Sequence, residues 1–421
     1  MAAAPEGFEQ AASALAVDEF LPARRLLRIA VVTETYPPEV NGVASTIAQV
    51  VEGLRARQHA VQLVRPRQAA DAPGEAQAEP RCEQVLMRGL PIPRYPHLKM
   101  GVPSRKALAA LWALKRPDIV HIATEGPLGW SALQAARRLG LPVCSDFRTN
   151  FHAYSRHYGV GWLHRPIMAY LRRFHNRTRC TMVPTEALRG ALEAAGFRGL
   201  RVVPRGVDTQ RFDPACRSEA LRATWGVRPG QPVALYVGRL APEKNLDLLA
   251  RAFEAMRRDA PALRLVLVGD GPMRRELQHR LPGAVFVGER RGDDLAAHYA
   301  SGDLFLFPSL TETYGNVTPE AMASALPVLA FDEAAAGRLI RHGDNGLLAP
   351  PGDADSFVRQ ALRLVNDLPA ARGLGRRARE AVCEHGWDRI VAQVEQIFLA
   401  ELRSGPPLPS GLWRTTEAAG R

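Results

Sequence analysis

The chain has 421 residues, 46% of them hydrophobic and 23% charged, a composition typical of globular proteins at a length that suits two or three domains. No apolar run approaches the roughly 20 residues of a membrane-spanning helix, and the N-terminus lacks the basic region that marks a signal peptide. Five scattered cysteines without a C-x-x-C pair argue against a zinc site and a disulfide framework, and they favour a reducing, cytoplasmic location.

The net charge of +12 is unevenly distributed along the chain. Residues 1–206 contain 28 Lys and Arg against 16 Asp and Glu, whereas residues 207–421 contain 27 of each class. The most basic stretch, 147–185, holds seven arginines, four histidines and no acidic residue. It predicts a surface that faces anions, such as anionic lipid headgroups or an anionic substrate. Nucleic acid is disfavoured, because no nucleic-acid-binding motif is present.

The helical part of this basic stretch, 162–177, has two interpretations. Its apolar residues lie among arginines, a composition that suits an anionic membrane surface. The same composition suits a core helix whose arginines are solvated.

Short apolar runs separated by helical patterns follow a tail, 1–26, that we expect to be flexible. This alternation is typical of a parallel sheet covered by helices. A polar stretch rich in Ala and Pro, 68–83, is expected to form a surface loop. The strands expected in this half are 28–34, 60–66, 119–123, 142–147, 180–184 and 200–204, with helices at 105–114 and 130–139.

A break rich in Pro, Gly and Asp, 202–214, predicts an interdomain linker. A second series of strands follows it, and only helical patterns remain after 353. The expected strands are 233–238, 264–269, 284–288, 304–308, 327–331 and 346–349. We therefore predict an α/β protein with two doubly wound, Rossmann-like domains. The expected divisions are domains 27–206 and 207–387, a helix, 388–403, that crosses back to the first domain, and a flexible tail, 404–421.

Two glycine-containing loops suit a phosphate-containing ligand. In the first, 35–42, a strand, a loop ending in Gly42 and a helix form the geometry that faces phosphates in doubly wound sheets. The G-x-G-x-x-G fingerprint is absent, which disfavours a dinucleotide. In the second, 265–277, Gly269 and Gly271 form a turn between a strand and a helix, and alone such a turn is a common structural element.

The segment 236–245, YVGRLAPEKN, offers positive charge beside a predicted strand end. Gly238 allows a ligand to approach the backbone closely. Arg239 and Lys244 flank a short loop and can clamp two phosphates. Lys244 is the only lysine after residue 115, so its presence is not explained by composition.

The stretch 304–331 predicts a buried strand, a polar loop, a helix that opens on Pro319 and a second strand. Glu312 lies in the loop and Glu320 in the first turn of the helix. Acidic groups beside an anion-binding helix N-terminus suit sugar or ribose hydroxyls. A purely structural alternative is that Glu320 stabilises the helix dipole.

Together these motifs resemble the retaining glycosyltransferases of family 4, which have the GT-B fold. The matching segments are TETYPPEVNGV, PDIVHIATEGPLG, GRLAPEKN, VGDGP, ETYGNVTPE and NGLLAPPGD. The resemblance covers roughly residues 28–400. Within this family, the sequence is similar to bacterial GDP-mannose-dependent alpha-mannosyltransferases and related lipid glycosyltransferases.

The resemblance implies a role for each matching residue. Arg239 and Lys244 would hold the diphosphate of a nucleoside-diphosphate sugar. Glu312 would contact the sugar hydroxyls, and Glu320 would bind the ribose hydroxyls. No metal or other cofactor is implied, because the two cations can stabilise the charge of the leaving group. The other expected donor-binding residues are Gly42, Gly238, Gly269, Gly271, Gly315, Asn316 and Val317.

One position departs from the family pattern. Relatives often have a histidine near the donor sugar, where this chain has Arg148. An arginine cannot act as a base near neutral pH, but it places a fixed positive charge in the site. His152, four residues later, is a candidate to make the contact instead. The departure fits a mechanism in which the departing phosphate oxygen takes the acceptor proton.

We therefore expect an enzyme that moves a hexose, with retention, from a nucleoside-diphosphate sugar to a hydroxyl of a lipid or glycolipid. GDP-mannose is the leading donor, and UDP-glucose or another UDP-hexose is the alternative. The acceptor is expected at the inner face of the membrane. The rival functions are a same-fold epimerase or hydrolase and, from a different class, a non-catalytic basic binding protein.

Overall fold

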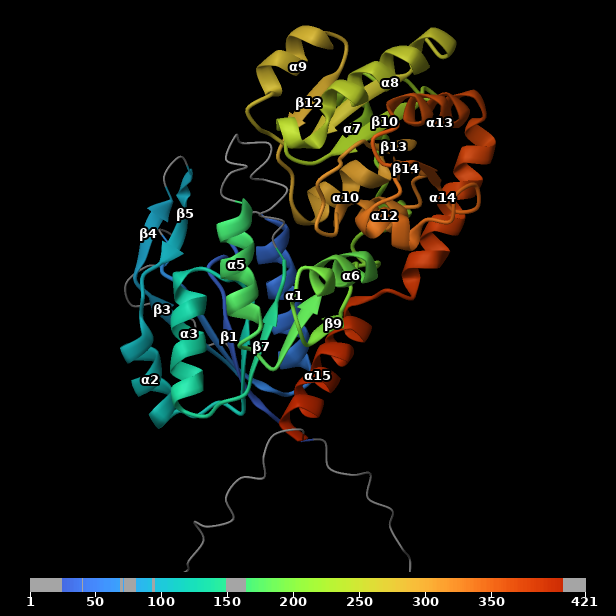
Figure 1. The fold of residues 1–421 in the computed structure, drawn as a ribbon. Coiled ribbons are helices and arrows are strands. Elements are labelled where there is room, and N and C mark those ends of the chain that lie inside the picture. The colour runs from blue at the N-terminus through green and yellow to red at the C-terminus, as the bar shows by residue number, and fades with distance from the viewer. Residues whose placement is uncertain are drawn as a thin grey trace, which may run out of the picture.

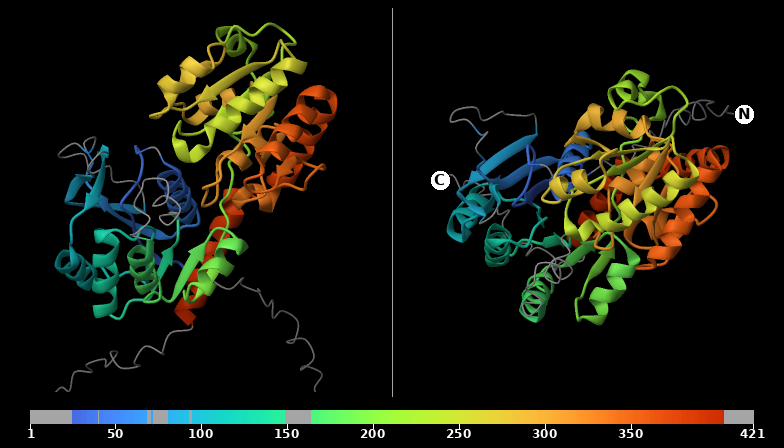
Figure 2. Two further views of the ribbon diagram at one scale, coloured as in Figure 1. Left: turned by 45° about the horizontal axis from the view of Figure 1, so that its top comes forward. Right: turned by 90° about the horizontal axis from the view of Figure 1, so that it is seen from above.

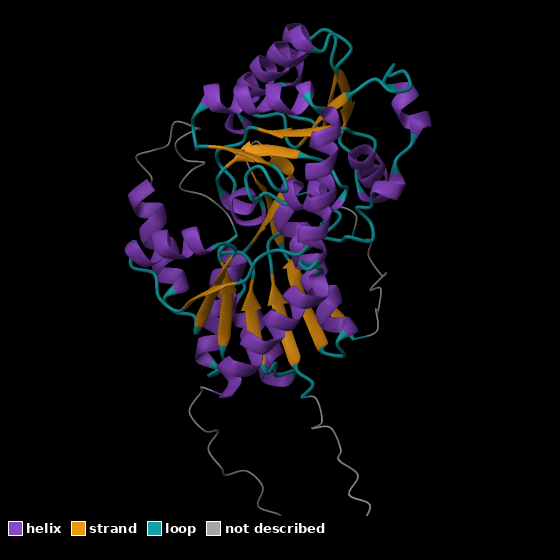
Figure 3. Ribbon diagram, turned by 90° about the vertical axis from the view of Figure 1, so that its right-hand side faces the viewer, coloured by secondary structure: helices purple, strands orange, loops and turns teal. Residues whose placement is uncertain are grey.

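The computed structural model describes residues 25–39, 41–68, 71, 81–92, 95–148 and 164–403. Two parallel β-sheets form two lobes, each with helices on both faces of its sheet (Figures 1 and 3). This arrangement confirms the predicted α/β fold with two doubly wound domains. The expected tails, 1–26 and 404–421, lie almost entirely outside the described residues, as does His152.

The N-terminal sheet has seven strands, and every neighbouring pair in it is parallel. Its strand order reverses between β1 and β6: the order runs back along the chain on the β1 side and forward along it on the β6 side. In spatial order the strands are β3 (Cys82–Met87), β2 (Ala60–Pro66), β1 (Arg28–Val32), β6 (Ile119–Ile122), β7 (Val143–Asp146), β8 (Cys180–Val183) and β9 (Leu200–Val202). The central strands β1 and β6 are buried at every residue except Arg28, because helices cover both faces of the sheet.

The helices of the N-terminal domain follow the strands in the expected alternation. They are α1 (Gly42–Ala56), α2 (Arg105–Leu114), α3 (Pro127–Arg138), α5 (His164–His175) and α6 (Glu186–Ala194). Within α5, Leu171 and Phe174 are buried while Arg172 and Arg173 are exposed. The described part of the basic stretch is therefore a core helix with solvated arginines.

Three strands of this domain were not predicted. Residues 82–83 of the expected surface loop belong to β3, and most of the rest of that loop lies outside the described residues. An antiparallel hairpin, β4 (Gly89–Ile92) and β5 (Tyr95–Gly101), follows it. The interruption by Pro and basic residues hides the alternation that would reveal these strands.

The C-terminal sheet has six parallel strands, and its order reverses between β10 and β13. In spatial order they are β12 (Val285–Gly288), β11 (Arg264–Val268), β10 (Val233–Val237), β13 (Leu304–Phe307), β14 (Val328–Phe331) and β15 (Leu347–Ala349). The α-helices are α7 (Glu219–Thr224), α8 (Leu246–Asp259), α9 (Arg274–Arg280), α10 (Gly292–Ala300), α11 (Val317–Ala323), α12 (Ala334–Leu339), α13 (Ala354–Asn366) and α14 (Leu368–Cys383). The reversal is where ligands bind in open α/β sheets.

The helix expected to open on Pro319 begins two residues earlier, at Val317. The prediction was wrong because proline fits anywhere in a first helical turn, where backbone N–H groups have no partner within the helix. Glu320 still lies in that first turn.

The last helix, α15 (Trp387–Arg403), leaves the C-terminal domain and packs on the N-terminal one (Figures 1 and 2). Its residues Ile390, Val394 and Phe398 are buried in the same core cluster as β1 and α1. A side chain at Gly53 of α1 would collide with Val391, so the two helices meet without a gap.

The connection between the two sheets is packed. Val203, Val207 and Phe212 are buried. The amide of Val207 donates a hydrogen bond to the carbonyl of His385, at 3.1 Å, so the two chain crossings between the domains lie side by side.

Candidate active site

Two loops meet where the order of the C-terminal sheet reverses. The loop after β10 contains residues 238–245, and the loop after β13 contains residues 308–316. Asn245 donates from Nδ2 to the carbonyl of Pro308 at 3.2 Å. The hydroxyl of Thr311 donates to the carbonyl of Glu243 at 3.1 Å. These bonds fix the loops against each other, so the residues that they carry form one site.

Glu312 and Lys244 form an ion pair between these loops. Only 18% of the Glu312 side chain and 12% of the Lys244 side chain are exposed. The hydroxyl of Ser309 also donates to Oε1 of Glu312, at 2.8 Å. Burial alone would raise the pKa of Glu312, but Lys244 and Ser309 outweigh it and hold the pKa below its ordinary value. Glu312 is therefore ionised at neutral pH.

Arg239, in the same loop as Lys244, pairs with the buried carboxylate of Glu243. Its side chain is 39% exposed. The carbonyl of Arg239 accepts a hydrogen bond from the buried hydroxyl of Tyr236, at 3.2 Å. This contact fixes the backbone at the point where the strand β10 ends, and the guanidinium stays at the surface of the site.

Glu320 lies in the first turn of α11 and accepts a hydrogen bond from the hydroxyl of Tyr299, at 2.9 Å. Burial raises the pKa of Glu320 to about 7, and the bond from Tyr299 offsets only part of that effect. No cation pairs with Glu320 among the described residues. The carboxylate is thus able to accept further hydrogen bonds, such as those of two neighbouring hydroxyls.

Gly269 and Gly271 hold the loop after β11 against the loop after β10. A Cβ on Gly269 would lie 2.0 Å from the carbonyl oxygen of Gly238, and one on Gly271 would lie 2.4 Å from that of Leu240. Both glycines have positive φ angles. The structure thus gives these glycines a packing role beside the site.

The N-terminal domain meets these loops at Gly42, the first residue of α1. A Cβ on Gly42 would lie 3.5 Å from Nη1 of Arg205 and 3.6 Å from Nδ2 of Asn316. Arg205 in turn donates from Nη1 to Oδ1 of Asn316, at 3.1 Å. Gly315 and Val317 flank Asn316. The site therefore includes groups from both domains.

Arg205 is a residue of this site that the sequence did not reveal. It lies in the segment interpreted as a linker, yet it is only 6% exposed. A guanidinium beside glycine and proline gives no local signal of its burial. Only the packing of the two domains places it next to Asn316.

Arg148 lies at the end of β7 on the N-terminal side. Its Nε and Nη2 lie 2.7 Å and 2.6 Å from Oδ2 of Asp146. His121 contacts the same oxygen through Nε2, at 2.7 Å. Burial would raise the pKa of Asp146, but Arg148 and His121 lower it to about 2. Arg148 thus pairs with a protein carboxylate at the place where relatives often have a histidine.

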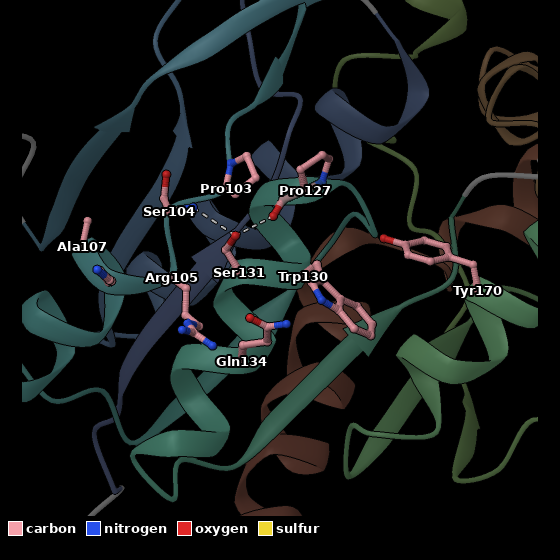
Figure 4. Close-up of a pocket in the computed structure, with 10 residues that line it drawn as sticks. Pro103, Ser104, Arg105, Ala107, Pro127, Trp130, Ser131, Gln134 and Tyr170 are labelled. Atoms are coloured by element: carbon pink, nitrogen blue, oxygen red, sulfur yellow. Dashed lines mark hydrogen bonds between the residues drawn. The ribbon is translucent and has the colours of Figure 1, made fainter.

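A cavity of about 770 Å³ lies on the N-terminal domain, between the first turns of α2 and α3 and the side of α5. Figure 4 shows Trp130 and Tyr170 on one side of it and Arg105 on the α2 side. The hydroxyl of Tyr170 donates to the carbonyl of Glu125, at 2.5 Å. The guanidinium of Arg177 lies over the Trp130 ring, 5.6 Å from its centre. None of the predicted donor-binding residues lines this cavity.

Comparison with known proteins identifies the family. Residues 40–211 match the family model described as "Glycosyltransferase Family 4", and residues 231–367 match the one described as "Glycosyl transferases group 1". A GDP-mannose-dependent alpha-mannosyltransferase of Mycobacterium tuberculosis is 37% identical over 85% of this chain and 94% of its own. The chain belongs to glycosyltransferase family 4.

Two further similarities of this family 4 glycosyltransferase are to a more distant relative and to a solved structure. The alpha-monoglucosyldiacylglycerol synthase of Streptococcus pneumoniae is 28% identical over 72% of this chain and 71% of its own. The sucrose-phosphate synthase of Thermosynechococcus elongatus superposes with a TM-score of 0.74 at 20% identity, over 90% of this chain and all of that chain. The second similarity confirms the predicted GT-B fold. Within the described part of this enzyme, no helix is both long and apolar enough to cross a membrane.

Proposed function

We propose that this glycosyltransferase moves mannose from GDP-mannose to a hydroxyl of a lipid or glycolipid, with retention and without a metal ion. The observation that carries the proposal is the buried Glu312–Lys244 pair at the reversal of the C-terminal sheet. The name of the 37% identical relative supports GDP-mannose as the donor. The name of the diacylglycerol glucosyltransferase supports a lipid acceptor.

The cations of the loop after β10 suit a diphosphate leaving group. When the bond between the sugar and the phosphate breaks, negative charge grows on the distal phosphate. Arg239 and Lys244 are positioned at one loop to stabilise that charge, which removes the need for a divalent cation. Lys244 would then be shared between Glu312 and a phosphate oxygen.

The carboxylates suit hydroxyl groups. Glu312 is ionised at neutral pH and would accept hydrogen bonds from sugar hydroxyls near the anomeric carbon. Glu320 would accept those of the ribose. Glu312 is paired with Lys244, so the acceptor proton has a better destination in the departing phosphate oxygen. In this step the acceptor oxygen bonds to the anomeric carbon on the face that the phosphate leaves.

The N-terminal domain suits an acceptor at the inner face of an anionic membrane. The helix α5, which has exposed arginines, contributes Tyr170 to the cavity that Trp130 also lines. Aromatic side chains with a polar end, together with basic residues, are suited to the headgroup region of a bilayer. This combination supports binding at the membrane surface.

A product assay tests the proposal. Purified enzyme is supplied with GDP-mannose, with and without a diacylglycerol- or polyprenol-based acceptor, in the presence of EDTA. We expect an α-linked mannosyl lipid that forms only when acceptor is present. Free mannose formed at the same rate without acceptor would indicate a hydrolase. A product formed only from UDP-glucose or another UDP-hexose would change the proposed donor and leave the proposed reaction class unchanged.

A further inference from the structure

Arg205 carries a buried charge that the reaction above does not use. Its backbone carbonyl accepts a hydrogen bond from the hydroxyl of Tyr314, at 3.1 Å. Its guanidinium lies 5.7 Å from the centre of the Tyr314 ring and donates from Nη1 to Asn316. Both ends of Arg205 are therefore held by the loop that contains Glu312, which leaves the orientation of the side chain fixed.

No carboxylate of the described chain forms an ion pair with Arg205, and its buried Nε has no hydrogen-bond partner there. Burial, together with the like charge of Arg148, lowers the pKa of Arg205 to about 10. The guanidinium is still protonated at neutral pH. A buried cation with unsatisfied N–H groups costs free energy unless an anion completes it.

The position of Arg205 indicates which anion this is. Its Nη1 lies beside Gly42, at the N-terminus of the 15-residue helix α1, which has no acidic residue in its first turn. The positive charge of Arg205 also contributes to lowering the pKa of Glu312. Arg205 thus lies beside a helix N-terminus and donates a hydrogen bond to the loop that contains the carboxylate proposed to hold the sugar. In a nucleoside-diphosphate sugar, the anionic group bonded to the sugar is the distal phosphate. We therefore expect the distal phosphate beside Arg205.

We propose that Arg205 binds the distal phosphate of the donor and is a third cation for the leaving group. This inference rests on the function proposed above. Lys244 and Arg239 each form an ion pair with a carboxylate, whereas Arg205 forms none with the described residues. As the bond to the anomeric carbon breaks, its electron pair moves to the phosphate oxygen, and Arg205 stabilises the charge that results.

Calorimetric titration with GDP and GMP tests this contact, because GMP lacks the distal phosphate. The proteins are the wild type, Arg205→Gln, Arg205→Lys and, as a matched control, Arg201→Gln, which changes an exposed arginine nearby. We expect Arg205→Gln to weaken GDP binding about 10- to 100-fold and to leave GMP binding unchanged. Arg205→Lys should show a smaller loss, and Arg201→Gln none. Turnover should fall in the same order.

Three results would overturn the inference. Unchanged affinity for both GDP and GMP in Arg205→Gln would assign Arg205 a structural role only. An equal loss for both nucleotides would place its effect on domain packing. If Arg205→Gln does not fold, the ratio of GDP to GMP affinity is measured on Arg205→Lys, where a wild-type value contradicts the contact. A wild type that binds neither GDP nor UDP would instead overturn the proposed function, and this inference with it.

Discussion

Two guanidinium nitrogens of Arg148 contact a single oxygen of the buried Asp146 carboxylate. The sequence alone suggested that Arg148 places a fixed positive charge near the donor sugar. In the structure that charge is neutralised by Asp146, which His121 also contacts. The ring of His121 in turn packs on Phe398 of the crossing helix α15, with centres 5.4 Å apart. A chain of contacts thus runs from Arg148, at the edge of the site, through Asp146 and His121 to the helix α15.

Arg148→Ala should therefore reduce stability. Removing Arg148 leaves the buried Asp146 with His121 alone, which we expect to cost about 1–3 kcal/mol in the free energy of unfolding at pH 7. The pKa of Asp146 is depressed, so this stabilisation is present above its unfolded pKa of 3.8 and is lost as the pH falls through about 2. The difference from wild type in urea unfolding should shrink over that window. Unchanged unfolding combined with a raised KM would show instead that Arg148 acts on the substrate; exposed Arg173→Ala is the control.

Lys244→Met should remove turnover and weaken nucleotide binding together. The change keeps most of the length of the side chain but removes the charge that a diphosphate would share with Glu312. We expect kcat to fall by at least about 100-fold and the Kd for GDP to rise. Initial rates and calorimetry measure the two effects. Lys115→Met, at an exposed lysine of the other domain, should change neither. Wild-type GDP affinity in Lys244→Met would contradict a phosphate contact.

Glu320→Gln should stabilise the protein at high pH while it weakens donor binding. Because the pKa of Glu320 is raised to about 7, the folded protein keeps a proton that the unfolded chain releases near 4.5. Wild-type stability should therefore fall as the pH rises from 4.5 through 7, and the glutamine variant lacks this loss. The gain in Tm over wild type should be larger at pH 8 than at pH 5. Exposed Glu276→Gln should give no such pH-dependent gain, and an equal gain at both pH values would refute the assignment.

Charge reversal on α5 tests the membrane contact. The double variant Arg172→Glu, Arg173→Glu should sediment less with anionic vesicles than wild type, since each basic residue near such a surface contributes about 1 kcal/mol. Binding of the wild type should also fall as salt is raised. The control reverses two exposed arginines of the other domain, Arg258→Glu and Arg275→Glu. Equal sedimentation of both double variants would rule out α5 as the contact.

Much of the fold follows from the sequence because its strands are buried on both faces. Runs such as 233–237 and 304–308 are apolar throughout, and the loops after them contain the residues with chemical roles. The expected strands in both sheets are correct to within two residues at each end. The structure also brings Arg239, Lys244 and Glu312 into adjoining loops, as the motifs implied.

What the sequence could not supply depends on contacts between distant segments. The contact of His121 with Asp146, the partner of Arg148, needs β6 and β7 to pair side by side. The burial of Arg205 needs both domains to be in place. The hairpin β4–β5 forms a separate two-stranded sheet and lacks a clean alternation of apolar and polar residues, so no periodic pattern in the sequence reveals it.

The crossing helix α15 has a consequence for how the chain folds during synthesis. The core of the N-terminal domain contains Ile390, Val394 and Phe398, which leave the ribosome after the whole C-terminal domain. His59 and Arg57 of that domain also wait for Glu395, whose carboxylate lies 2.9 Å and 2.8 Å from them. Domains commonly fold in the order of their translation. Here the first domain to emerge is completed only after the second has been made, so a truncated or stalled chain exposes an apolar face until translation ends.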